Sequence, residues 1–172
     1  MKNQSLIETR RIYPKKIAGG FCFKLQLGND PTNGNDGSLS TRWVANDNLY
    51  PHWWRVELGT NCNLSAVTTD WFGTGGRSYQ YKIEVSTNDI NNVVAVDKTG
   101  NTSKANTTDI FSALARYVRI TVTGVVPTGG NASFYECLVY GNVVPSVSLA
   151  PRSINKHYNG NLQQHDCPLL AE

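Results

Sequence analysis

The segment Asp36-Gly37-Ser38-Leu39-Ser40-Thr41 places a carboxylate, a glycine turn and several hydroxyl groups close together. Much later in the chain, Glu136 supplies a second carboxylate where the last strand is expected to begin. Carboxylate, hydroxyl and carbonyl oxygens are the ligands that Ca²⁺ prefers. These residues are compatible with a structural calcium ion that would tie this loop to the last strand, although an ordinary turn is the commoner meaning of an Asp-Gly pair. The alternative is that Asp36 only shapes an Asp-Gly turn and that Glu136 pairs with Arg42.

Aromatic and planar polar side chains gather in three expected loops, and this combination suits sugars. Rings pack against the C–H faces of a sugar, and planar polar groups reach several hydroxyls at once. The predicted carbohydrate-binding residues are Arg42, Asn46, Asp47, Tyr50, Trp71, Phe72, Arg77 and Asn131.

Several of these residues also have a structural interpretation. Trp71 ends an expected strand, so it either completes the core or stands exposed as a platform for a ligand. Asn46 and Asp47 could merely shape a turn. We expect His52 to be a partly buried, hydrogen-bonded histidine. The remaining tryptophans are expected to pack in the core or against the sheet: Trp43, Trp53 and Trp54.

The sequence offers no catalytic constellation. It contains neither a G-x-S-x-G elbow nor an H-E-x-x-H motif. Asp47 and Asp70 are a conceivable carboxylate pair for glycoside hydrolysis, but both lie in expected exposed loops. The residues therefore predict a binding protein and not an enzyme.

The elements that position these residues read as β-structure throughout. The chain has 172 residues, 40% of them hydrophobic and 10% aromatic, enough for one cored domain. Five segments alternate apolar and polar residues as half-buried strands do, and they are separated by Gly- and Asn-rich turns. They are residues 53–58, 64–71, 80–86, 116–122 and 134–140. This pattern predicts a two-layer sandwich.

Charge and composition exclude other classes. Residues 1–28 carry six basic residues and one acidic residue, so the remaining residues have a net charge of −2 out of the total of +3. We therefore expect no nucleic-acid partner, which would need basic residues on the folded body. No apolar run is long enough for a transmembrane segment.

The expected domain boundaries are a basic N-terminal tail at 1–16, a module at 17–142, and a C-terminal tail or linker at 143–172. The cysteines are too widely spaced for a zinc site: Cys22, Cys62, Cys137 and Cys167. They are expected to be buried thiols or to form a disulfide, for which Cys22 with Cys137 is one candidate.

Five segments, in order, resemble the discoidin or coagulation-factor (F5/8) type C domain and, most closely, the family 32 carbohydrate-binding modules. They are "NGNDGSLSTRW", "HWWRVELG", "YQYKIEVSTN", "ARYVRITVTG" and "NASFYECLVYG", and together they span about residues 29–142. The resemblance implies a jelly-roll β-sandwich of the galactose-binding-like type, with ligand loops at one end.

The resemblance also implies particular site residues. Asp36 and Glu136 would bind calcium through their side chains and Thr41 through its side chain and backbone, while carbonyl ligands would come from Asn33, Ser38 and Tyr135. Galactose-specific members tend to carry a histidine where this chain has Val44, so galactose is not implied as the ligand.

The resemblance implies a non-catalytic module that binds an oligosaccharide or polysaccharide, secreted and once fused to a catalytic domain. Alternatives are a discoidin-type adhesion or anionic-lipid-binding domain and a free-standing lectin. The N-terminus lacks the apolar core of a signal peptide. Either such a segment has been removed or the chain is cytoplasmic.

Overall fold

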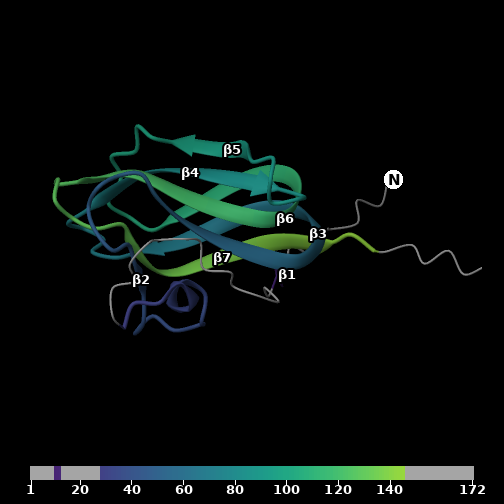
Figure 1. The fold of residues 1–172 in the computed structure, drawn as a ribbon, viewed down its shortest axis with the longest axis horizontal. Coiled ribbons are helices and arrows are strands. Elements are labelled where there is room, and N and C mark those ends of the chain that lie inside the picture. Colours follow the sequence, from purple (N-terminus) through teal and green to yellow (C-terminus); the bar gives the residue numbers. More distant parts are fainter. Residues whose placement is uncertain (1–9, 13–27, 146–172) are drawn as a thin grey trace, which may run out of the picture.

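The computed structural model describes residues 10–12 and 28–145, which are almost entirely β-structure (Figure 1). The strands are β1 (Arg10–Ile12), β2 (Trp43–Val44), β3 (His52–Trp71), β4 (Ser78–Ser86), β5 (Val93–Lys98), β6 (Thr107–Val126) and β7 (Ser133–Val143). Within the described residues, the helical structure is limited to a 3₁₀ turn, η1 (Pro31–Gly34). The all-β prediction is confirmed.

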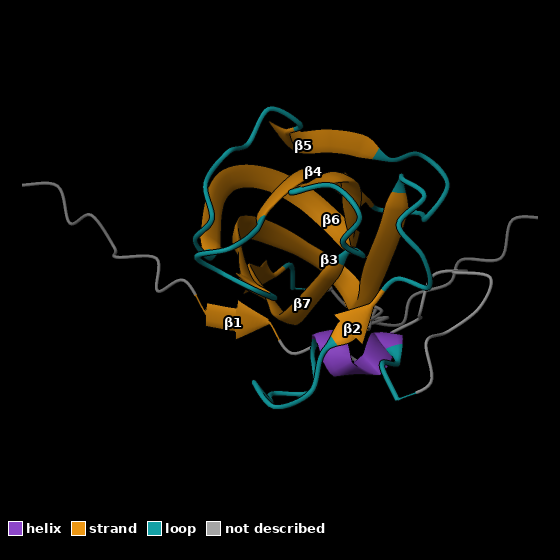
Figure 2. Ribbon diagram, turned by 90° about the vertical axis from the view of Figure 1, so that its left-hand side faces the viewer, coloured by secondary structure: helices purple, strands orange, loops and turns teal. Residues whose placement is uncertain are grey.

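The strands form one antiparallel sheet that folds over itself. The order is β1-β7-β3-β6-β4-β5, and β2 also pairs with β7. Residues 52–57 of β3 pair with the part of β6 that lies beside β4, whereas residues 62–69 lie between β6 and β7. Register shifts in β3 between Glu57 and Cys62, where Gly59 has a φ of +82°, separate the two parts. The result is a sandwich whose two layers share β3 and β6 (Figure 2).

The core lies between the layers and follows the alternation read from the sequence. In β4, Tyr81, Ile83 and Val85 are buried, whereas Lys82 and Glu84 are partly exposed. Trp43 and Trp54 are buried as expected, and each packs against Phe134, with ring centroids 5.0 Å and 5.3 Å apart. Trp53 is partly buried on the outer face.

The folded domain begins earlier in the chain than predicted. Arg10–Ile12 lie in the segment predicted to be a tail, yet they pair with Val139–Gly141 of β7. Ile12 is 8% exposed because it covers the edge of the core, so part of the basic segment belongs to the folded domain. Residues 13–27 and 146–172 lie outside the described residues.

Cys62 and Cys137 are buried free thiols. Cys22, the candidate partner of Cys137, lies outside the described residues, as does Cys167. No helix in the described part of the chain is long and apolar enough to span a membrane.

Candidate functional site

A hollow of about 220 Å³ opens where three loops meet at one end of the sandwich. The loops surround β2, connect β3 to β4, and connect β6 to β7. They meet because β3 ends where β7 begins, with Trp71 paired to Phe134. We call this site the loop-end hollow. It is lined by Arg42, Val44, Phe72, Arg77, Gly129, Gly130, Asn131 and Ser133.

Backbone hydrogen bonds hold the three loops together. The N–H of Ala45 donates to the carbonyl of Ala132 over 2.8 Å, and the N–H of Phe72 donates to the carbonyl of Ser133 over 3.2 Å. The side-chain amide of Asn131 donates to the carbonyl of Ala45 over 2.9 Å. The three loops are therefore held in place by hydrogen bonds to their main chains.

Phe72 supplies the aromatic surface of the loop-end hollow, and two guanidinium groups approach it. The Cζ of Arg42 lies 3.6 Å from the centroid of the Phe72 ring, and the Cζ of Arg77 lies 5.2 Å from it. Both distances are within the range of cation–π attraction. The ring of Tyr135 meets Phe72 edge-on, with 5.8 Å between centroids. Phe72 therefore orients both arginines.

Arg77 is held by a tight turn and by a close approach to a glycine. Its N–H donates to the carbonyl of Gly73 over 2.9 Å, which closes the turn between β3 and β4. A Cβ at Gly130 would lie 3.1 Å from Nη1 of Arg77. A side chain at this position would therefore crowd the guanidinium, and glycine leaves room for it.

Two phenols, of the partly buried Tyr50 and the buried Tyr79, support the loops of the hollow. The hydroxyl of Tyr50 donates to the carbonyl of Gly130, and that of Tyr79 donates to the carbonyl of Phe72 over 2.8 Å. Burial raises the pKa of Tyr50 to about 12, although nearby Arg77 acts in the opposite direction. Burial also raises the pKa of Tyr79. Both phenols therefore remain neutral donors at neutral pH and fix the backbone of their loops.

Four predicted carbohydrate-binding residues come together in this hollow: Arg42, Phe72, Arg77 and Asn131. Asn46 and Asp47 do not line it. Asp47 accepts hydrogen bonds from the N–H of Leu49 over 2.9 Å and from Nε2 of His52 over 2.8 Å. These contacts, the Leu49 bond above all, lower the pKa of Asp47. Asp47 thus shapes the turn, and His52 is hydrogen-bonded as expected.

The prediction of Trp71 as a ligand platform is wrong, because Trp71 lies in the core. It is 3% exposed, and its Nε1 donates to Oγ1 of Thr107 over 3.1 Å. The alternation of β3, in which Val67 and Thr69 are also buried, continues to the end of the strand and turns Trp71 inward.

Sequence reasoning missed the lining residues Val44, Gly129, Gly130 and Ser133. The segment from Pro127 to Asn131 was recognisable as a turn, but not as a wall of a site. Its two adjacent glycines carry no side chain, and Gly130 thereby leaves room for the guanidinium of Arg77. The hydroxyl of Ser133 donates to the carbonyl of Trp43 over 2.8 Å, so its role is to hold β2 in place.

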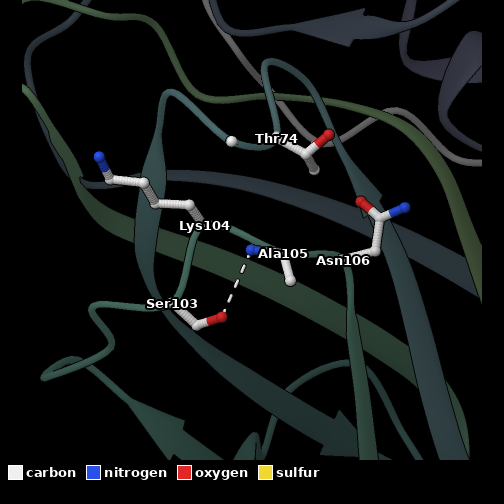
Figure 3. A pocket seen from close by; sticks show the side chains of 6 residues that line it. Thr74, Ser103, Lys104, Ala105 and Asn106 are labelled. Atoms are coloured by element: carbon white, nitrogen blue, oxygen red, sulfur yellow. Dashed lines mark hydrogen bonds between the residues drawn. The ribbon is translucent and has the colours of Figure 1, made fainter.

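A second and larger hollow, of about 680 Å³, lies between the loop after β3 and the loop before β6. It is lined by Thr74, Gly75, Ser103, Lys104, Ala105 and Asn106. Figure 3 shows the side chains of Lys104 and Asn106 extending to opposite sides, so they do not converge on a ligand. The amide of Asn106 already bonds Asp70 and the N–H of Trp71, at 2.8 Å and 2.9 Å. The smaller loop-end hollow is therefore the better candidate, despite its size.

The predicted calcium loop folds around Asp36. Its Oδ1 accepts from the N–H of Ser38 over 2.9 Å, and its Oδ2 accepts from Oγ1 of Thr41 over 2.6 Å. Gly37, with a φ of +84°, makes the turn between them. Burial acts to raise the pKa of Asp36, but the hydrogen bonds from Thr41 and Ser38 outweigh it, so the pKa is lowered. The side chain of Asn33 bonds the carbonyls of Gly28 and Arg42, at 3.2 Å and 3.3 Å.

Glu136 reaches this loop from β7. It is 3% exposed, and its Oε1 accepts from the N–H groups of Gly37 and Ser38, at 2.7 Å and 3.2 Å. Its Oε2 is buried and accepts no hydrogen bond from the described residues, while Nη2 of Arg11 lies 3.6 Å away. Burial raises the pKa of Glu136, and the neighbouring Asp36 adds to the rise. The expected alternative pair with Arg42 is not formed; the basic partner is Arg11.

The residues at this junction fit a hard cation. Asp36 and Glu136 are adjacent carboxylates, and one buried oxygen of Glu136 has no hydrogen-bond donor. Among residues 10–12 and 28–145, no three His, Cys, Asp or Glu side chains cluster. Further ligands would therefore come from hydroxyl and carbonyl oxygens, which suits calcium and not zinc. Asp36 and Glu136, with Thr41 beside them, are the residues that could hold the ion.

Comparison with solved structures places the fold. The family 32 carbohydrate-binding module of AlyQ, in complex with 4,5-unsaturated mannuronic acid, is 24% identical with a TM-score of 0.64, covering 76% of this chain and 97% of that chain. Chitosan-binding module 2 of a Paenibacillus sp. IK-5 chitosanase/glucanase, in complex with chitotriose, is 24% identical with a TM-score of 0.64, covering 76% and 98%.

A family 32 module of Clostridium perfringens, in complex with GlcNAc-α-1,4-galactose, is 21% identical with a TM-score of 0.64, covering 82% of this chain and 100% of that chain. The predicted galactose-binding-like sandwich is therefore confirmed. No curated protein matches the sequence. The sequence profile of the NedA-like, galactose-binding domain matches residues 33–120, which is more than half of the chain. The chain therefore belongs to the F5/F8 type C family of NedA-like, galactose-binding domains.

Proposed function

We propose that this protein is a non-catalytic carbohydrate-binding module whose ligand site is the loop-end hollow. The observation that carries the proposal is the convergence of Arg42, Phe72, Arg77 and Asn131 in one hollow held open by main-chain hydrogen bonds. An aromatic face beside planar polar groups suits the alternating C–H and hydroxyl surfaces of a sugar. The fold shared with modules solved in complex with three different saccharides supports the proposal.

The lining of the hollow supports binding without catalysis. The described residues that form it include no carboxylate, histidine or cysteine. Glycoside hydrolysis usually requires two facing carboxyl groups about 5–9.5 Å apart. A binding module instead needs a preformed surface, and a weak single site becomes effective through attachment to a catalytic domain or through several copies. A location outside the cell, where polysaccharides are found, is part of the same proposal.

The proposal is tested by a glycan array of neutral, acidic and amino oligosaccharides, followed by calorimetric titration of each ligand found. We expect binding of at least one saccharide and no release of reducing ends. Phe72→Ala should weaken binding at least tenfold in a protein that remains folded by circular dichroism. Lys104→Ala, in the second hollow, serves as the matched control and should bind normally. Failure of the folded wild-type protein to bind any saccharide would refute the proposed function.

We also propose a structural calcium ion at Asp36, Glu136 and Thr41. The buried, unbonded Oε2 of Glu136 beside a second carboxylate supports this proposal. A cation would relieve the repulsion between the two carboxylates and would link the loop before β2 to β7. Because such an ion binds the native state and not the unfolded chain, it would stabilise the fold by mass action.

A discoidin-type, lipid-binding function is the second candidate, and one observation favours it. Leu39 and Leu49 project from loops with exposed fractions of 65% and 75%. Exposed apolar side chains beside basic groups can insert into a bilayer surface. Sedimentation with vesicles that contain phosphatidylserine tests this function. Binding that is lost in a Leu39→Ser, Leu49→Ser double variant would support it over the carbohydrate proposal.

A further inference from the structure

We propose that the loop-end hollow selects acidic saccharides, in which a sugar unit carries a carboxylate or a sulfate group. This inference rests on the proposed carbohydrate-binding function and names its substrate class. The five arginines of residues 28–145 differ in whether they form ion pairs. Three of them are paired with carboxylates on the sheet surface: Arg55 with Asp89, Arg116 with Glu57 and Arg119 with Glu84.

Arg42 and Arg77 are the exceptions among the described residues 28–145, because neither forms an ion pair there. Both line the same hollow, although they come from different loops. A domain with a net charge of −2 beyond residue 28 has enough carboxylates to pair them. The two unpaired guanidinium groups are therefore concentrated at the candidate site and are not spread over the surface.

The surroundings of the two arginines provide no internal counter-charge. The titratable neighbours on the adjoining elements are the phenols of Tyr50, Tyr79 and Tyr135, and the pKa values of Tyr50 and Tyr79 are raised. Asp47, the acidic residue of the loop after β2, already bonds His52 and Leu49. At neutral pH the lining of the hollow therefore carries two positive charges and no negative one.

The arginines are also positioned for recognition and not only for long-range attraction. The Cζ of Arg42 lies 3.6 Å from the centroid of the Phe72 ring, and its Nη1 is shielded from solvent without a hydrogen-bond partner in the described residues. Arg77 is confined by Gly73 and Gly130. Guanidinium groups have a planar fork of donors that matches the two oxygens of a carboxylate or sulfate. Because both groups are partly withdrawn from water, their attraction for an anion is less screened than that of an exposed lysine.

The size of the hollow sets how much of a ligand it holds. At about 220 Å³ it is smaller than the roughly 300–1,000 Å³ of ordinary small-molecule pockets. It therefore suits one sugar unit whose acidic group faces the two arginines. Neutral sugars can use Phe72 and Asn131, but they leave the two guanidinium groups without an anion. Amino sugars add a third positive charge, so we expect them to bind worst.

The test compares saccharides that differ only in charge. A trigalacturonate is titrated beside the same trisaccharide with its carboxyl groups reduced to alcohols, and chitotriose serves as the cationic probe. A 6-sulfated galactose trisaccharide distinguishes sulfate from carboxylate. We expect the wild-type protein to bind an acidic trisaccharide at least tenfold more tightly than the reduced one, and to lose this preference progressively between 50 mM and 1 M NaCl.

Variants separate recognition from general charge. Arg77→Gln and Arg42→Gln should each lower the ratio of acidic to reduced affinities at least fivefold. Arg77→Lys, which keeps the charge but loses the planar fork, should give an intermediate ratio. Lys104→Gln removes the same charge from the neighbouring hollow and should leave the ratio unchanged. Circular dichroism and melting temperature confirm that each variant is folded.

The outcomes separate this inference from the proposed function. If neutral and acidic trisaccharides bind equally, or if the ratio is unchanged in both arginine variants, the inference is wrong although the module still binds sugar. If Phe72→Ala then abolishes the binding of neutral trisaccharides, the loop-end hollow is still the carbohydrate site. If no saccharide of any charge binds the folded protein, the proposed function and this inference both fail.

Discussion

The indole of Trp71 stacks on the ring of Tyr79, with centroids 4.4 Å apart and ring planes inclined by 14°. Both residues are buried, with exposed fractions of 3% and 1%. The next residue, Phe72, lines the loop-end hollow. The end of β3 therefore sends two adjacent aromatic side chains to different environments, one to the core and one to the loop-end hollow.

This division predicts opposite consequences for truncating the two neighbours. Trp71→Ala should lower the free energy of unfolding by about 3–5 kcal/mol, because it leaves a cavity beside Tyr79. Phe72→Ala should lower it far less but should weaken saccharide binding. Urea denaturation and calorimetric titration measure the two effects. A Trp71→Ala protein with normal stability and impaired binding would return Trp71 to the ligand site.

The sandwich could be predicted from the sequence because most of its strands are buried on one face. In β4 the alternation of Tyr81, Ile83 and Val85 with polar residues is direct evidence of a sheet. β5 lacks this signal, since it is an edge strand whose Val93 and Val94 are both exposed. β1 is too short for a pattern and is defined by its pairing with β7.

The site could be predicted only in part, for a different physical reason. Arg42, Phe72 and Arg77 could be predicted as sugar-binding candidates because their side chains suit a sugar and they lie in expected loops. The structure brings all three into one hollow. The alternation of β3 turns Trp71 inward, but a register shift lies just before Trp71 pairs with Phe134, and the sequence does not reveal that the alternation continues across this shift. Which arginines form ion pairs also depends on the register of the strands. The sequence therefore does not show that Arg42 and Arg77 are the unpaired arginines of residues 28–145.

Gly34 is predicted to tolerate no side chain, because η1 lies directly against the core. A Cβ at Gly34 would lie 2.8 Å from Cε2 of Phe134 and 2.9 Å from Nε1 of Trp54. Gly34→Ala should therefore lower the free energy of unfolding by roughly 1–3 kcal/mol. Gly100→Ala, where no atom lies within 4 Å, is the matched control and should change it by less than about 0.5 kcal/mol. Equal melting temperatures for the two variants would contradict the packing of η1.

The pair formed by Glu84 and Arg119 predicts a pH-dependent stability. Nε and Nη2 of Arg119 donate to the carboxylate over 2.9 Å and 2.7 Å. Burial acts to raise the pKa of Glu84, but the hydrogen bonds from Arg119 and the Thr121 hydroxyl outweigh it, so the pKa lies below its ordinary 4.5. Because the pKa of Glu84 is lower in the native state than in the unfolded state, ionised Glu84 stabilises the fold fully at pH values above its unfolded-state pKa. This stabilisation is lost as the pH falls through its native-state pKa.

We therefore expect Glu84→Gln to lower the free energy of unfolding by about 1–3 kcal/mol at pH 7. The difference from the wild-type protein should shrink as the pH falls below 4.5. Urea denaturation of both proteins between pH 3.5 and 7 measures this change. A difference that stays constant over this range would mean that the side chain acts through packing and not through its charge.

Calcium removal is predicted to destabilise the fold through Asp36 and Glu136. An ion at one hundred times its dissociation constant stabilises the native state by about 2.7 kcal/mol, so EDTA should lower the melting temperature by several degrees. Glu136→Gln keeps an oxygen for the N–H groups of Gly37 and Ser38 but loses the charge. Its melting temperature should therefore not respond to calcium, whereas that of Glu57→Gln, whose carboxylate pairs with Arg116 on the sheet surface, should respond normally.

If the melting temperature of the wild-type protein does not respond to calcium, Arg11 offers the explanation. Its Nη2 lies 3.6 Å from the buried Oε2 of Glu136, so β1 already brings one positive charge to the paired carboxylates. If wild-type melting is the same in calcium and EDTA, this guanidinium is the counter-ion and the calcium proposal is wrong. Arg11→Gln should then be strongly destabilised in both solutions, because Glu136 would be left buried and unpaired. If calcium is bound, Arg11→Gln should instead keep its response to calcium, since the ion supplies the charge that the variant lacks.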